Sequence, residues 1–579
     1  MCKFFIKPTV LSLVFLELGC STPFKESTGQ IDPGTPSSAT QETQDSEFLP
    51  LKTITLPFEH KSTVEHSLEN RMEEIELLVP ARPGDGWEVD LGINLLQQKA
   101  EKLGLTLENA VALTLSNNLD IQIATLTPEI SEQDVIEAEA AFDFVFGASL
   151  NSQKTKRPQQ QVVVGGIATS TSESSVNTLD GDASLSTLLT SGGSLTISTD
   201  VTRTNNQSPD TQLTPNPAWQ TIGTLDFTQP LLRNFGDTVT LAQIRLKEIS
   251  HNQSKEDLQE TLNISIASTE RAYLELALQW KVLQVKNWLL EQGEQVVNIL
   301  DLRRSYDTGE ADYAQAVATV QQRKADVITQ QARVQESSDT LKNLINSEEY
   351  SLHSETVIQP IGVIEASPII LSPRQAIVTA LENRPDIKKL LLSIRAESIQ
   401  VDVADNARMP KLDMQAQMAF YGLGGSAGDG YQEVFDTDFI NYLAGLSFEV
   451  PLGNRAAEAG YTSARLQKMR AIATYKKGIQ NATVEVKKSV RNVLTNAELI
   501  HANKAYRLAQ TENLRALSVE EETMAGLSPT FLNLKLQTQS GLANARIAEF
   551  TSIINYNKSI VDLYRSMGTT LVMYQIDLE

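Results

Sequence analysis

The segment from Gly424 to Gly428, Gly-Gly-Ser-Ala-Gly, has the Gly-x-Ser-x-Gly spacing of a nucleophile elbow. In such an elbow Ser426 would attack an acyl group, with a histidine and an acid brought to it by the fold. An elbow needs a strand before the serine and a helix after it, whereas this segment lies between two stretches that alternate like strands. We therefore predict a surface hairpin loop. A hydrolase built on Ser426 remains an alternative, in which Ser426→Ala would abolish turnover of an ester.

Metal and cofactor chemistry has no recognisable pattern in the sequence. The five histidines, at positions 60, 66, 251, 353 and 501, are scattered, and none is in a His-Glu-x-x-His or cysteine-paired arrangement. We predict no metal, no cofactor and no enzymatic activity.

The cysteines point to the cell envelope. Residues 1–20 read as an export signal, with Lys3 and Lys7 before the apolar run 10–16. The sequence Leu-Glu-Leu-Gly-Cys at 16–20 resembles a bacterial lipobox, which implies that Cys20 is acylated and becomes the first mature residue. Cys2 leaves with the leader, so the mature chain has no internal disulfide.

Net charge limits the partners. The chain carries a formal charge of −23, with 49 basic against 72 acidic residues, so it is repelled by phosphate backbones and we predict no nucleic-acid partner. After the leader, no uninterrupted apolar stretch reaches the roughly 18–20 residues of a membrane helix. If this protein crosses a membrane, it must do so with β-strands.

An internal repeat organises the chain. We assign residues 21–104, rich in Ser, Thr, Pro, Gln and Glu, to a low-complexity periplasmic linker with short helical pieces near 69–78. Positions 105, 110, 115, 117, 120 and 121 then match 371, 376, 381, 383, 386 and 387 at a constant offset of 266. The repeats are 105–355 and 356–579, and each reads helix, strands, long helix, turn, helix.

Several segments alternate apolar and polar residues over the length of a membrane strand. Apolar positions share one face at 142, 144, 146, 148 and 150, at 412–420, and at 440–450. A further pair, 184–189 and 194–202 around Ser191-Gly192-Gly193, is expected to add a hairpin. A soluble β-sandwich would show the same alternation.

The predicted helices are long. Residues 237–292 contain neither Pro nor Gly, and a helix of that length would span roughly 80 Å. Residues 310–358 and 479–525 are also free of both. Apolar residues at 278, 282, 285, 289, 296 and 300 form a coiled-coil seam. A helical bundle without a transport role would show the same pattern.

Strands and helices together indicate an assembly. One chain offers four to six membrane-type strands, whereas a closed barrel needs about eight, and unpaired edges are costly in lipid. Several chains must therefore share one barrel, each continuing into long helices. Pro230 and Pro451 mark the points where strands give way to helices.

The duplicated plan, with strands ending in Thr-Gln-Pro-Leu-Leu (228–232) and Val-Pro-Leu-Gly (450–453), resembles the TolC-like outer membrane factors over residues 105–579. The resemblance implies an α+β fold in which a long α-helical coiled-coil barrel joins a transmembrane antiparallel β-barrel shared by a homotrimer. It implies a lipid-anchored protein in the outer membrane of a Gram-negative bacterium, in contact with outer-membrane lipids and extending into the periplasm. It further implies docking to a periplasmic adaptor, with an inner-membrane pump supplying energy.

In such proteins the helix-to-helix turns at the periplasmic tip meet the adaptor, which assigns docking to Gly309, Glu310, Asp312, Gly526, Leu527 and Ser528. A plain helical-hairpin turn is the alternative. Acidic residues crowd the same turns, and threefold repetition would make acidic rings that gate the tunnel, although solvated helix ends would look the same. The gate candidates are Asp301, Asp307, Glu520, Glu521 and Glu522.

We thus expect a passive exit duct of a tripartite efflux pump or a type I secretion system. The sequence does not separate small-molecule from protein cargo. A coiled-coil lipoprotein that bridges envelope layers without a pore is the second hypothesis, and it would not need membrane-length alternating strands.

Overall fold

The structure is a computed structural model, and it describes residues 54–55, 62–81, 89–158, 163–165, 167–168, 173–207, 214–305, 308–362, 364–523 and 528–576. All of these residues belong to one compact unit, Leu51–Glu579. Cys20 and the leader lie outside the described residues.

The predicted repeat is confirmed at its opening helices. The first copy has α4 (Leu107–Asn117) and α5 (Leu119–Glu139), and the second has α9 (Pro373–Asn383) and α10 (Pro385–Asn406). Their first residues differ by the 266 positions that the sequence match predicts. Thr106 and Ser372 begin the paired helices in the same way, because each side-chain oxygen accepts from the backbone N–H three residues later.

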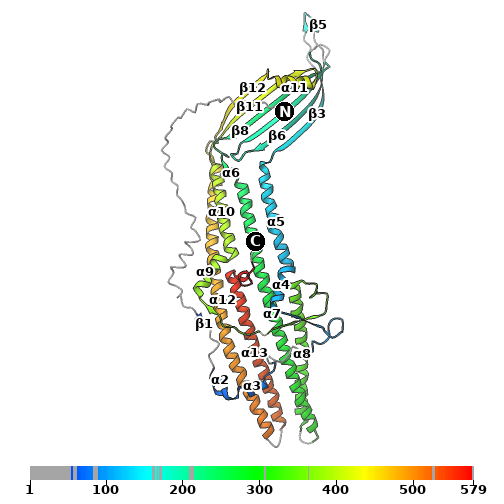
Figure 1. Cartoon of the computed structure of the whole chain (residues 1–579), viewed down its shortest axis with the longest axis vertical. Helices are drawn as coiled ribbons and strands as arrows, with labels where there is room; N and C mark the ends of the chain where they lie inside the picture. The colour runs from blue at the N-terminus through cyan, green and yellow to red at the C-terminus, as the bar shows by residue number, and fades with distance from the viewer. Residues whose placement is uncertain are drawn as a thin grey trace, which may run out of the picture. The chain divides into compact units, whose positions relative to one another are not determined.

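A six-stranded antiparallel sheet follows the opening helices, in the order β12-β11-β8-β7-β6-β3. Its members are β3 (Val145–Pro158), β6 (Glu173–Leu188), β7 (Ser194–Asn206), β8 (Ala218–Pro230), β11 (Lys411–Gly424) and β12 (Ile440–Glu449). The expected extra hairpin is confirmed as β6–β7, and β8 pairs with β11, so strands of both repeats join one sheet. Figure 1 shows this sheet at one end of the long helices.

Two ends of the sheet differ in detail from expectation. Phe142 lies in the short 3₁₀ helix η2 (Ala140–Phe142) and β3 begins only at Val145, so the part of the first apolar stripe that lies in the strand starts at Phe146. At the other ends, Pro230 is the last residue of β8 and Pro451 follows the end of β12 by two residues, and the next helices begin at Asp237 and Arg455.

The remaining repeat elements are long helices. They are α6 (Asp237–Thr240), α7 (Ala242–Arg303), α8 (Glu310–Ile345), α12 (Arg455–Thr523), α13 (Pro529–Met567) and the short α14 (Thr570–Met573). The 62 residues of α7 and the 69 of α12 confirm the predicted rods. α8 is shorter than its Pro- and Gly-free run, because Asn346 adopts the left-handed conformation at φ 46° and ends it. No helix in the described ranges is both long and apolar enough to cross a membrane.

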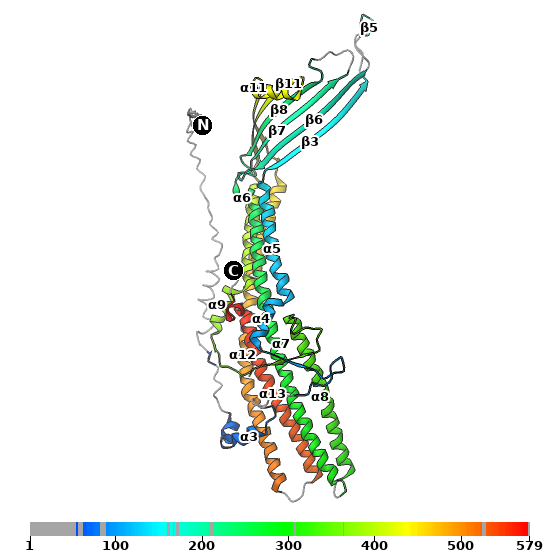
Figure 2. The ribbon, with the colours of Figure 1, turned by 45° about the vertical axis from the view of Figure 1, so that its right-hand side comes forward.

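The predicted seam of α7 faces α13, and Figure 2 shows the two helices side by side. Leu278 and Val282 pack with Ile554, and further along Val296 and Leu300 pack with Leu532. Apolar burial along this line holds the two repeats together.

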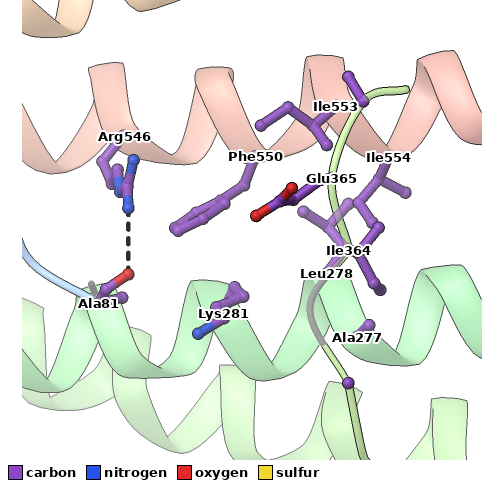
Figure 3. Close-up of a pocket in the computed structure, with 12 residues that line it drawn as sticks. Ala81, Ala277, Leu278, Lys281, Ile364, Glu365, Arg546, Phe550, Ile553 and Ile554 are labelled. Carbon is purple, nitrogen blue, oxygen red and sulfur yellow. Dashed lines mark hydrogen bonds between the residues drawn. The ribbon is translucent and has the colours of Figure 1, made fainter. Parts of the chain in front are cut away.

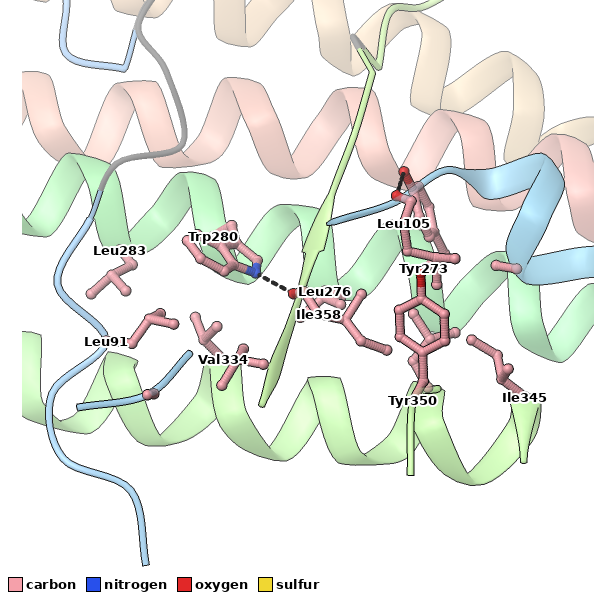
Figure 4. Packing of buried hydrophobic residues seen from close by; sticks show 14 of the residues in the cluster. Leu91, Leu105, Tyr273, Leu276, Trp280, Leu283, Val334, Ile345, Tyr350 and Ile358 are labelled. Atoms are coloured by element: carbon pink, nitrogen blue, oxygen red, sulfur yellow. Dashed lines mark hydrogen bonds between the residues drawn. The ribbon is translucent and has the colours of Figure 1, made fainter. Parts of the chain in front are cut away.

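A second core lies between α7 and α8, where β9 (Val357–Pro360) pairs in parallel with β2 (Lys102–Leu105). Trp280 is fully buried and donates its indole N–H to the Ile358 carbonyl at 3.0 Å (Figure 4). The Tyr273 hydroxyl bonds to the carbonyl oxygens of Leu105 (3.1 Å) and Ile361 (2.9 Å), and burial raises the pKa of Tyr273 to about 12. These bonds satisfy the polar atoms of two large aromatic side chains inside the core.

The segment assigned to a linker is partly packed. It forms α2 (Thr63–Leu68), η1 (Glu69–Arg71) and α3 (Met72–Leu78), which fits the short helical pieces expected near 69–78. Ile75 is fully buried, and Glu65 pairs with Lys504 of α12 at 2.5 Å. β1 (Ile54–Thr55) pairs with β10 (Ile370–Leu371). The described part of 54–104 is therefore bound to the helices rather than a free tether, because its few apolar residues find a partner surface that composition does not reveal.

The two-stranded pair of β4 (Val163–Val164) and β5 (Ile167–Ala168) completes the described strands.

Candidate functional site

Two helical hairpins end at the same end of the helices, away from the sheet (Figure 1). One joins α7 to α8 and the other joins α12 to α13. Gly309 and Ser528 are the N-caps of α8 and α13, and the Ser528 side chain accepts from the backbone N–H of Phe531. The structure thus places Gly309, Glu310, Asp312 and Ser528 at the hairpin ends. Asp307, Gly526 and Leu527 lie outside the described residues, as does the side chain of Glu522.

The acidic residues at these ends are partly neutralised. Arg304 donates two hydrogen bonds to Glu310, Nε to Oε1 at 3.0 Å and Nη2 to Oε2 at 2.8 Å, and these bonds lower the pKa of Glu310. Glu521 is paired with Lys535 at 2.5 Å. Asp301 and Glu520 are exposed. Because Glu521 is already paired within its own chain, it can contribute less to an acidic ring than the charge count suggests.

Contacts between the hairpins fix the ends relative to each other. The amide nitrogen of Asn533 on α13 lies 3.4 Å from the carboxylate of Asp312 on α8. Leu300, Ala316 and Leu532, from three different helices, share one buried cluster. The two turns are therefore held by a common core.

A buried arginine links three helices near these ends, and no motif in the sequence marks it. Arg323 on α8 is 4% exposed and donates to the carbonyl oxygens of Leu289 on α7 (2.7 Å) and Leu536 on α13 (2.8 Å). It also reaches Ser540 Oγ at 3.1 Å. Burial lowers the pKa of Arg323 to about 10. Gly293 leaves room for the guanidinium, since a Cβ there would lie 2.8 Å from Nη1.

A second buried charge network ties the N-terminal segment to the helices. Arg546 donates to the backbone carbonyl of Ala81 at 3.1 Å (Figure 3). It also donates to the Pro80 carbonyl at 3.2 Å and pairs with Glu549 at 2.5 Å. Arg507 pairs with Glu549 at 2.8 Å and, through Nη2, with Glu76 at 2.8 Å. Truncating one member would leave a buried charge without its partner, which is costly.

A cavity of about 360 Å³ opens beside this network. Figure 3 shows the Phe550 ring between Arg546 and the apolar wall, with Lys281 across the cavity on α7. The Arg546 guanidinium lies 4.1 Å from the centroid of Phe550. No sequence motif marks this cavity, because its walls come from α7, α13 and the connection between the repeats. Among the described residues, no cluster of His, Cys, Asp and Glu has the arrangement of metal ligands.

The sheet has two chemically different faces. Cross-strand register places apolar side chains on one face of all six strands. A line across the sheet runs through Phe146, Leu185, Ile197, Leu225, Met418 and Tyr442. The opposite face carries polar residues such as Asp182, Ser198, Thr224 and Gln417. Phe146, Leu446 and Phe448 are more than half exposed, so this apolar face is not the core of a sandwich.

The hairpin-loop prediction for 424–428 is wrong. β11 ends at Gly424 and α11 (Ala427–Asp436) begins at Ala427 with Ser426 as its N-cap, so the serine does have the strand before it and the helix after it that the sequence argument took to be absent. The Ser426 hydroxyl accepts from the Asp429 N–H at 3.3 Å, while the Asp429 carboxylate accepts from the Ser426 N–H at 3.1 Å. The serine oxygen thus caps a helix. The alternating stretches on both sides do not reveal that a helix connects them, and Gly424 lets that helix pack closely, since a Cβ there would lie 2.5 Å from the Asp429 Cβ.

Part of the sequence matches a known protein family, and the fold resembles solved structures. Residues 376–569 match the family model described as outer membrane efflux protein. The Campylobacter jejuni CmeC outer membrane channel has 15% sequence identity and a TM-score of 0.58, over 86% of this chain and 99% of that one. The outer membrane protein VceC of Vibrio cholerae has 16% identity and a TM-score of 0.55, over 80% and 96%. No curated protein sequence matches the chain.

A third structure, the open state of the Neisseria gonorrhoeae MtrE outer membrane channel, has 15% identity and a TM-score of 0.54 over 80% of this chain and 89% of that one. These identities establish a shared fold. The expected fold class, long helices joined to a sheet with a repeated plan, is confirmed.

Proposed function

Since the chain carries an outer membrane efflux protein domain at residues 376–569 within the fold of outer membrane channels, we propose that it is one subunit of an efflux channel. The channel lies in the outer membrane of a Gram-negative bacterium and extends into the periplasm. It is a passive duct and not an enzyme. The observation that carries the proposal is the exposed apolar face across all six strands, continuous with helices of 62 and 69 residues.

The sheet supports assembly of several copies. Among the described strands, β3 and β12 each pair on one side only, so the sheet has two open edges. Open edges are costly in hydrocarbon, where no water satisfies the free backbone groups. In a homotrimer the edges of neighbouring chains pair, and three sheets of six strands supply 18 strands. Sheets of 16–18 strands enclose an aqueous channel.

The hairpin ends supply the docking surface of this proposal. A periplasmic adaptor meets Gly309, Glu310, Asp312, Gly526, Leu527 and Ser528, and an inner-membrane pump drives the cargo. The acids at 301, 307, 520, 521 and 522 form the proposed gate, with Glu521 weakened by its pairing to Lys535. Acylation of Cys20 anchors each subunit to lipid, and mass spectrometry of the mature N-terminus tests it.

A coiled-coil spacer without a pore is less well supported. Such a spacer would gain nothing from an exposed apolar sheet face, which costs solubility. The two functions separate in cells: a channel mutant accumulates a dye that the pump expels, and the protein fractionates with the outer membrane as a crosslinked trimer. Wild-type dye levels in a deletion strain, with the protein in the soluble periplasm, would contradict the proposal.

A further inference from the structure

Helix α11 is fixed by close packing to the end of the sheet that lies away from the long helices (Figure 1). It connects β11 to β12 and packs on β11 and β8. Glycines permit the contact, since a Cβ at Gly422 would lie 2.0 Å from the Gly430 carbonyl oxygen. A Cβ at Gly430 would likewise lie 2.6 Å from Thr221 Oγ1. The backbone of α11 therefore packs directly against the backbone of β11 and the side chain of Thr221 on β8.

Two polar contacts hold α11 in register. The Glu433 carboxylate accepts from the Leu423 N–H at 2.6 Å. Leu423 lies on β11 beyond its last pair with β12, Phe420 with Ile440. The Tyr431 hydroxyl lies 3.0 Å from Thr199 Oγ1 on β7. Both contacts join α11 to different strands, so the helix is part of the sheet's own structure.

The face on which α11 lies is the apolar one. On β11, Gly422 is on the same face of the sheet as Met418 and Phe420. On β8, Thr221 is on the same face as Leu225. From Leu412 to Phe420 the apolar stripe of β11 covers nine residues, about the length with which a tilted strand crosses hydrocarbon. α11 begins to cover β11 immediately beyond that stripe, at Gly422.

Aromatic side chains lie near α11 at this end of the sheet. Phe435 projects from α11 itself and is 78% exposed. Trp219 lies on the neighbouring strand, opposite Gly424, with the Arg203 guanidinium 5.8 Å from its ring. Aromatic residues gathered at one depth are typical of the boundary between hydrocarbon and headgroups.

We propose that α11 is a membrane-interface helix that lies on the lipid-facing side of the sheet, with Phe435 inserted among the outer-leaflet lipids. The inference rests on the proposed function, because that function makes the apolar face the lipid-facing one. The helix sets the depth of the strands in the bilayer, as short amphipathic helices do when their apolar side enters the headgroup boundary. The alternative, in which α11 lies in the aqueous pore, is an outcome of the test below.

Quenching by brominated lipids tests the placement. Three variants, Phe435→Trp, Leu446→Trp and Leu423→Trp, are each reconstituted as full-length trimers into phosphatidylcholine vesicles with bromine on the upper acyl chains. The tryptophan emission of the unsubstituted protein is measured in the same vesicles and subtracted. Leu446 is exposed on the apolar face of β12, and Leu423 is exposed on the opposite face of β11 near α11. Leu446 is therefore the control for a lipid-facing position, and Leu423 is the control for a pore-facing one.

We expect bromine to remove more than half of the added emission from Phe435→Trp and Leu446→Trp, and aqueous iodide to quench only Leu423→Trp. Quenching of Leu446→Trp without Phe435→Trp would overturn the α11 placement and leave the channel intact. No lipid quenching at either position would overturn the proposed function as well. If Phe435→Trp fails to form trimers, Phe435→Cys labelled with a small environment-sensitive fluorophore reports the same position.

Discussion

Replacing Gly309 with leucine should separate docking from folding at the hairpin ends. Gly309 has φ −66° and ψ 144°, an extended conformation open to any L-residue. The nearest atom to an added Cβ is the Asp312 Oδ2 at 3.2 Å, the end of a flexible side chain. The fold therefore tolerates the side chain, and removing a glycine from the unfolded chain should stabilise the protein by about 0.4–1 kcal/mol.

Docking should respond in the opposite direction. If an adaptor packs closely over Gly309, the leucine side chain overfills the interface, and overpacking costs about 1–3 kcal/mol. At 25 °C this corresponds to adaptor binding weaker by about 5- to 150-fold. Gly460→Leu is the matched control, because a Cβ at Gly460 on α12 meets no atom within 4 Å and lies far from the hairpin turns along the sequence.

The assay measures three quantities on each variant: thermal dissociation of the trimer, binding of the purified adaptor, and accumulation of a pump-exported dye in cells. For Gly309→Leu we expect an intact trimer with weakened binding and raised dye, and for Gly460→Leu all three at wild-type values. Unchanged binding and dye in Gly309→Leu would refute the docking role of this turn. Loss of the trimer would refute the structural reasoning instead.

Three further predictions concern stability, each measured by thermal unfolding in detergent. Gly192→Ala should destabilise the β6–β7 turn by about 1–3 kcal/mol, because Gly192 has φ +87° and its Cβ would lie 2.2 Å from a backbone oxygen; an unchanged melting temperature would refute this. Arg323→Met should lower the free energy of unfolding by about 1.5–3 kcal/mol, because the hydrogen bonds of the charged guanidinium are lost. A variant more stable than wild type would mean that burying the charge costs more than these hydrogen bonds contribute. Burial raises the pKa of Glu270 against the opposing effects of Tyr574 and Arg271. The stability contribution of this carboxyl is therefore present below its unfolded pKa and lost as pH rises through the folded one, so Glu270→Gln should raise the melting temperature more at pH 7 than at pH 4. An equal shift at both pH values would contradict that sign.

Local periodicity accounts for most of what the sequence could predict. Three features can be read from sequence alone: the 266-residue offset, the long helices free of Pro and Gly, and the alternating strands. They need no knowledge of the fold, because each pattern lies within single elements of the chain. The seam of α7 also followed from spacing alone, because a heptad-like stripe must be buried against something. Its partner, α13, could not be identified from spacing.

Features that depend on distant partners were missed. Arg323 finds its carbonyl acceptors 34 and 213 residues away, so nothing around it in the sequence marks it as buried. The sequence predicts a loop where α11 lies, because alternation shows the two flanking strands and not the element that connects them. In the folded protein Gly422 and Gly430 instead allow helix and strand backbones to touch. The packing of residues 62–81 was missed for the same reason, since Ile75 is buried only by contact with other helices.

The most direct test of a passive exit duct is single-channel conductance of the purified mature protein in a planar bilayer, with crosslinking of the same sample to count subunits. We predict discrete conductance steps from a trimer, in the range of wide aqueous pores, since the proposed trimer would line the lumen with three six-stranded sheets. A trimer that never conducts, even after the acids at 301, 307, 520, 521 and 522 are neutralised, would contradict the account.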